Sequence, residues 1–163
     1  MVKRLGLVAV LILLIELQAC SPSQLVADLS AVVDAASVAV AFVPSLSPQA
    51  KAEIAKYLRA IAQASSESSV ILASGQLNAV MVARIVELFA RVALPVIPGL
   101  PLQVSAAIDA VAAAVTAFLG QLQPIQAHTT TTRVKLNRAD TEALIQVKTK
   151  AAQVVMELQK AGY

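Results

Sequence analysis

The sequence predicts an all-α protein, an antiparallel bundle of about five helices that follows a cleaved signal peptide. The chain is rich in alanine and valine, and aromatic residues make up only 3% of its 163 residues. Because alanine is the strongest helix former, this composition favours helices with closely packed small side chains. Apolar residues also recur at spacings of three and four between proline and glycine breaks, as they do on one face of a helix.

We expect the first helix over residues 24–42, with Ser23 as its N-cap and Pro44 as the residue that ends it. Apolar residues surround nearly the whole of this segment. That pattern is typical of a helix buried in a protein core or in a membrane.

The second helix is expected over residues 48–74. Ser47 caps it, Pro48 suits its first turn because that position needs no N–H donor, and Gly75 ends it. Residues 65–69 are rich in serine. Because serine hydroxyls compete for backbone hydrogen bonds, we expect a kink or break there.

The third helix is expected over residues 76–94, before a stiff turn that begins at Pro95. Arg84, Glu87 and Arg91 are spaced for ion pairs along one face of this helix. Its other face is apolar and is expected to pack in the bundle.

The fourth helix is expected over residues 102–119, with Gly120 as its end. Residues 121–137 then read as a loop. Within it, residues 129–136 are expected to be extended because they are rich in threonine and carry alternating apolar residues.

The last helix is expected over residues 138–161, with Asn137 as its cap and Asp140 in its first turn. Its apolar residues form a heptad seam of less than three full heptads, which favours packing inside a bundle over a free coiled coil. The seam consists of Leu144, Val147, Ala151, Val154, Leu158 and Ala161.

The N-terminus has the pattern of an export signal. Lys3 and Arg4 precede an apolar run over residues 5–15, which as a helix spans roughly 16 Å and is too short to cross a bilayer core. A basic start, a short apolar core and a small residue before the cut are typical of a secretory signal.

The end of this segment resembles the lipobox of bacterial lipoproteins. Leu17, Ala19 and Cys20 match its aliphatic, small and cysteine positions, whereas Gln18 and Glu16 depart from the pattern. The resemblance implies cleavage between Ala19 and Cys20, and a covalent diacylglycerol and acyl chain on Cys20.

This interpretation divides the chain and places it in the cell. We expect a signal peptide over residues 1–19, a lipidated tether over residues 20–23 and a single domain over residues 24–163. The protein would be anchored in the bacterial cell envelope, facing the periplasm or the cell exterior. Plain secretion with a chance cysteine, or an uncleaved anchor, are the alternatives.

No catalytic constellation is recognisable in the sequence, so we expect a protein that is not an enzyme and holds no metal or other cofactor. His128 is the only histidine and has no partner cysteine for a zinc site. Asp28, Asp34 and Asp109 lie on apolar helices, where either they face one cavity as a cation site or each faces solvent.

The leading expectation is a structural or interaction module with a membrane anchor and an envelope protein as its partner. The small positive excess of the mature chain does not indicate nucleic-acid binding. The last helix is the expected contact surface. Its basic residues form the candidate interaction face: Arg138, Lys148, Lys150 and Lys160.

Two alternatives remain open. Small side chains between the helices would leave room for an apolar ligand or lipid, which makes the protein a carrier. Residues 77–119 would instead insert into a membrane, since Asp109 is the only charge between Arg91 and Arg133.

Overall fold

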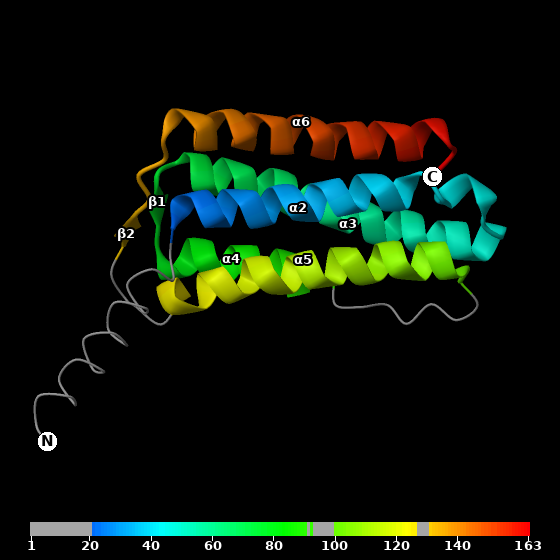
Figure 1. The fold of residues 1–163 in the computed structure, drawn as a ribbon, viewed down its shortest axis with the longest axis horizontal. Helices are drawn as coiled ribbons and strands as arrows, with labels where there is room; N and C mark the ends of the chain where they lie inside the picture. Colours follow the sequence, from blue (N-terminus) through cyan, green and yellow to red (C-terminus); the bar gives the residue numbers. More distant parts are fainter. Residues whose placement is uncertain (1–20, 91, 93–99, 127–130) are drawn as a thin grey trace, which may run out of the picture.

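The computed structural model describes residues 21–90, 92, 100–126 and 131–163, and over these ranges the protein is an all-α bundle, as the sequence predicts (Figure 1). The described α-helices are α2 (Pro22–Val40), α3 (Pro48–Ala73), α4 (Ala79–Ala90), α5 (Leu102–Gln126) and α6 (Arg138–Lys160). A short 3-10 turn, η1 (Val43–Ser45), and two strands, β1 (Gln76–Leu77) and β2 (Thr132–Arg133), complete the described elements.

All five described helices contribute to one hydrophobic core, in which α2 and α3 lie between α6 on one side and α4 and α5 on the other (Figure 1). Each helix reverses the direction of the one before it, so α6 runs parallel to α2. Two side-chain contacts confirm this parallel pairing. Ser23 contacts Asp140 near the starts of the two helices, and Asp34 contacts Lys150 about three turns further along both.

Small aliphatic side chains and two phenylalanines fill the core. Phe89 of α4 and Phe118 of α5 are fully buried and meet edge to face, with their ring centroids 5.2 Å apart. The seam of α6 is buried from Leu144 to Leu158, so it packs inside the bundle as expected. Ala161 is the exception, because it is the exposed C-cap.

Helix α2 begins two residues earlier than predicted. Ser21, not Ser23, is the N-cap and accepts a hydrogen bond from the Gln24 amide at 3.4 Å, with Pro22 in the first turn. The prediction was wrong because proline already has the backbone angle of a helix and its missing N–H costs nothing in the first turn. The helix ends at Val40, two residues before the predicted end, and Pro44 lies inside the 3-10 turn η1 that follows.

Helix α3 follows the prediction closely at both ends but does not break at residues 65–69. Ser65 and Ser68 are completely buried, and Ser69 donates to the Ser66 carbonyl oxygen at 2.8 Å. The expected break is wrong, and the helix stays continuous because these serines serve as small buried side chains that allow neighbouring helices to approach closely.

The predicted third helix is shorter than expected. Gly75, with a φ of +70°, ends α3, and Gln76–Leu77 then form a strand in place of the first helical turn. This strand pairs antiparallel with β2, with Gln76 opposite Arg133. Pairing with a distant segment overrides local helix propensity here. The predicted end at residue 94 and the turn from Pro95 lie outside the described residues.

Helix α5 is longer than predicted and passes through Gly120 to Gln126. Gly120 keeps a helical backbone and has no positive φ. Among the described glycines, only Gly75 and Gly162 have one. Leu122 and Ile125 are buried and continue the apolar face beyond the glycine. Of the stretch expected to be extended, Thr132–Arg133 forms β2, while residues 127–130 lie outside the described part.

Candidate functional site

The predicted anchor lies directly before the first described residue. Ala19, Cys20 and also His128 are outside the described residues, so the predicted cleavage and acylation there stay predictions. Ser21 is described, and it is the N-cap of α2. Of the residues 20–23 expected to form a tether, Pro22 and Ser23 belong to the helix.

Helix α2, which Ser21 caps, begins at the end of the bundle that also carries both strands (Figure 1). We call this the strand end and define it as residues 21–23, 74–78 and 132–140. The chain enters α2 there, and α6 begins there after β2. Any group attached to the residue before Ser21 is consequently adjacent to this end of the molecule.

Asp140 connects the two helices that start at the strand end. Its Oδ2 accepts hydrogen bonds from Ser23 Oγ and from the Asn137 amide, each at 3.2 Å. Asn137 Oδ1 accepts in return from the Asp140 amide at 2.8 Å, which completes a capping box at the start of α6. With 7% exposure, Asp140 is buried, and these donors satisfy its carboxylate.

Two basic side chains at the strand end point outward because burial alternates along the extended backbone. Val134 is 5% exposed and its amide donates to the Gly75 carbonyl oxygen at 2.9 Å, while Arg133 and Lys135 on either side are exposed. Within the described ranges neither of these two cations has a hydrogen-bond or ion-pair partner.

The four residues of the predicted interaction face do not form one patch. Arg138 is in the first turn of α6 and pairs with Glu142 at 2.9 Å, whereas Lys160 is in the last turn, roughly 33 Å away along the helix. Lys148 and Lys150 are separated by about 200° around the helix axis. An interaction role for any of them stays a prediction.

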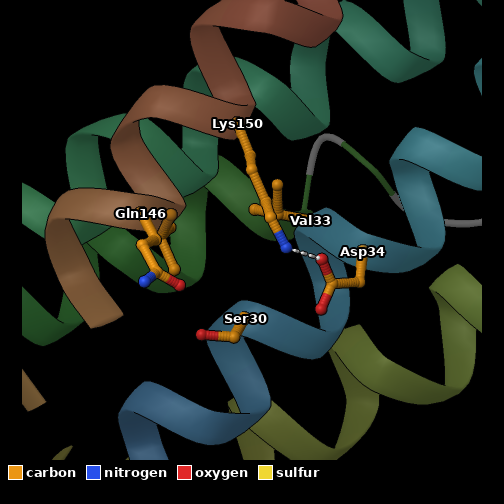
Figure 2. Close-up of a pocket in the computed structure, with 6 residues that line it drawn as sticks. Ser30, Val33, Asp34, Gln146 and Lys150 are labelled. Carbon is orange, nitrogen blue, oxygen red and sulfur yellow. Dashed lines mark hydrogen bonds and ion pairs between the residues drawn. The ribbon is translucent and has the colours of Figure 1, made fainter. Parts of the chain in front are cut away.

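Lys150 instead binds within the molecule, as Figure 2 shows. Its Nζ lies 2.5 Å from Asp34 Oδ1 on α2, beside a small pocket between α2 and α6. The volume of about 70 Å³ suits one or two water molecules rather than an organic ligand. The pocket is lined by Ser30, Val33, Asp34, Gln146, Val147 and Lys150.

The three aspartates on the apolar helices have separate environments. Asp28 accepts a hydrogen bond from Gln24 Nε2 at 2.8 Å, Asp34 binds Lys150, and Asp109 is exposed on α5. Within the described part of the chain, no group of three or more acidic, histidine or cysteine side chains is placed to hold a metal ion. The alternative of a shared carboxylate site is therefore wrong.

An apolar groove of about 310 Å³ lies at the surface between α3 and α6. Its lining is Ala62, Gln63, Ser66, Glu67, Ala151, Ala152 and Val155. Beside it, Arg84 of α4 bridges Glu67 at 3.1 Å and Glu87 at 3.3 Å. The hydrogen bond and charge of Glu67 raise the pKa of the Arg84 guanidinium above its ordinary value. Sequence spacing revealed the pair with Glu87 but gave no signal for the contact with Glu67, which is on another helix.

Two described segments, Pro22–Ser45 and Leu102–Gln126, are long and apolar enough to cross a membrane by length and composition. This is weak evidence for insertion, because the core helices of a soluble bundle meet the same criteria. Both helices here also supply buried residues to the core.

Comparison with protein families, with curated proteins and with solved structures finds no significant match to this chain.

Proposed function

We propose that this protein is a lipid-anchored, non-enzymatic module of the bacterial cell envelope. The observation that carries the proposal is the lipobox-like end of the export segment at Cys20. One acyl chain holds a protein at a membrane only weakly, whereas two or three hold it firmly, since each buried methylene contributes about 0.8 kcal/mol. Acylation would also consume the only thiol of a protein exported to an oxidising compartment.

Membrane fractionation tests the anchor. The wild-type protein is expected in the membrane fraction, to resist extraction by high salt and to be released by detergent. Cys20→Ala is expected to abolish maturation at this site. Recovery of mature wild-type protein in the soluble fraction would contradict the proposal.

The module is proposed to bind an envelope protein through α6. Support comes from two large apolar side chains on its outer surface, Ile145 at 62% and Met156 at 52% exposure. They are eleven residues apart, about three helical turns, and so lie almost on one line along the helix. The line between them is the part of α6 that we propose faces the partner.

Crosslinking in cells tests this contact surface. Ile145→Ser with Met156→Ser is expected to remove crosslinks to the partner, while the matched pair Val38→Ser with Leu102→Ser, also exposed, is expected to keep them. Identical crosslink patterns in both double variants would count against α6 as the contact surface.

A carrier of an apolar ligand is the second candidate. The groove between α3 and α6 favours it, because small side chains leave an apolar depression of about 310 Å³ there. Native mass spectrometry of the membrane-extracted protein is expected to detect a co-purified lipid that Ala152→Leu displaces. A spectrum without bound lipid would count against this role.

Membrane insertion of residues 77–119 is a further candidate that α5 favours by its length and composition. It predicts dye leakage from phospholipid vesicles. Intact vesicles at saturating protein would count against it.

A further inference from the structure

We propose that the strand end of the bundle lies flat against the anionic phospholipid headgroups of the membrane that holds the anchor. Arg133, Lys135 and Arg138 are the contacting side chains. This inference rests on the proposed anchor at Cys20 and adds the orientation of the domain and the class of lipid that it contacts.

The first step is the position of the anchor relative to the bundle. Cys20 is bonded directly to Ser21, and Ser21 is the N-cap of a helix that begins at Pro22. Adjacent Cα atoms are about 3.8 Å apart, so the proposed acyl chains attach within one residue of a rigid helix. The strand end is then held at the membrane surface, because no flexible linker separates them.

The second step is the link from the anchor to the basic residues. Ser23, in the first turn of α2, donates to Asp140 in the first turn of α6 at 3.2 Å. Arg138 starts that same helix, and β2 leads into it across the end of the bundle (Figure 1). The three basic residues consequently belong to the part of the molecule nearest to the anchor.

The third step is charge. Arg133 and Lys135 point outward without partners among the described residues, and Arg138 has a side chain that is 94% exposed despite its pair with Glu142. Asp140 is buried and its carboxylate is occupied by the capping box, so Glu142 is the only exposed acidic group beside these cations in α6. The outward surface is therefore basic.

The opposite end carries charges of both signs. Near the start of α3 and the end of α6, Lys51, Lys56 and Lys160 are accompanied by Glu53 and Glu157. The attraction of an anionic membrane decays over a Debye length, about 8 Å at physiological ionic strength. Only a surface beside the anchor experiences it. Since the anchor already supplies binding, a few such contacts suffice to orient the domain.

Acetylation of lysines with an uncharged reagent measures this orientation. The acylated wild-type protein is reconstituted in vesicles of phosphatidylcholine alone or with added phosphatidylglycerol, and peptide mass spectrometry compares Lys135 with Lys56. Both lysines are exposed, but Lys56 is on α3 toward the other end of the bundle. Acetylation of Lys135 relative to Lys56 is expected to slow several-fold only in the anionic vesicles.

A pair of matched variants assigns the effect to charge. Arg133→Gln with Arg138→Gln is expected to restore rapid labelling of Lys135 in anionic vesicles. Arg59→Gln with Lys160→Gln removes the same charge from other exposed positions and is expected to leave the protection unchanged.

The outcomes separate the orientation from the anchor. Acylated protein whose Lys135 reacts equally fast in both kinds of vesicle overturns the orientation and leaves the anchor in place. Protein whose Cys20 carries no acyl chain overturns both, because nothing then holds the strand end at a membrane.

Discussion

At the scale of single residues, Asp140 joins two helices that are far apart in the chain. It caps α6 and joins α6 to the first turn of α2, and it does so while buried. The sequence predicts the cap, because Asn137 and Asp140 have the spacing of a capping box. It does not predict the bond from Ser23, because 117 positions separate the two residues in the chain.

Asp140→Ala is expected to lower the free energy of unfolding by about 1–3 kcal/mol, because it removes one half of the capping box and leaves the Ser23 hydroxyl without its acceptor. Urea unfolding followed by circular dichroism measures this. Glu142→Ala, which removes an exposed ion pair, is the control and is expected to cost less than about 1 kcal/mol. Equal losses in the two variants would contradict the role of Asp140.

Tyr57 gives the protein an alkaline limit. Burial raises the pKa of its phenol from 10.0 to about 12. The unfolded chain loses this proton near pH 10, and the folded chain loses it only near pH 12. The contribution of Tyr57 to the free energy of unfolding is therefore complete below pH 10 and falls as the pH rises from 10 to 12. In urea unfolding, Tyr57→Phe is expected to lose less stability than the wild type across the window. Parallel curves for the two proteins would refute this.

At the scale of elements, two glycines that look alike in the sequence have different roles. Each follows an apolar helical segment, and each was expected to end its helix. Gly75 does so with a φ of +70°, whereas Gly120 stays helical. Burial of Leu122 and Ile125 contributes about 1.5–3 kcal/mol each, which outweighs the cost of about 1 kcal/mol for a glycine within a helix.

Alanine substitution distinguishes the two glycines. A Cβ at Gly120 meets no atom within 4 Å, so Gly120→Ala is expected to stabilise the fold by about 0.5–1 kcal/mol. Gly75→Ala places a side chain in the left-handed region and is expected to destabilise it by about 1–2 kcal/mol. Thermal unfolding measures both. A destabilised Gly120→Ala would mean that α5 ends where the sequence pattern first indicated.

The buried serines of α3 make a second prediction at this scale. Ser65 Oγ and Ser68 Oγ are buried without a hydrogen-bond partner. Replacing both serines with alanine is expected to raise the free energy of unfolding by about 1–2 kcal/mol, because two unsatisfied hydroxyls are removed. Ser69→Ala loses a bond to the Ser66 carbonyl oxygen and is the control, with a smaller gain or a loss expected. A destabilised double variant would contradict this account.

At the scale of the whole molecule, the sequence predicts the all-α bundle and the order of its helices, because apolar periodicity and caps are local signals. The packing of α6 is also predicted from its seam. The strand pairing and the contact between Lys150 and Asp34 are not, since they join segments far apart in the chain. Pairing energies of this kind depend on the folded arrangement rather than on neighbouring residues.

The basic residues of the strand end were likewise only partly predicted from the sequence. Composition draws attention to the basic residues of the C-terminal segment, but the sequence groups Arg138 with three lysines of its own helix. In the folded molecule Arg138 lies instead at the strand end with Arg133 and Lys135, and Lys150 is bound to α2. The parallel arrangement of α2 and α6 decides which basic residues lie on one surface. No local sequence pattern predicts that arrangement.

The intact mass of the protein extracted from bacterial membranes tests the central claim most directly, with Cys20→Ala measured in parallel. We predict a mature chain that begins at Cys20 and carries a diacylglycerol and an acyl chain, and we predict that the variant lacks this species. An unmodified chain, or one that retains Met1, would contradict the lipid anchor and with it the orientation proposed for the strand end.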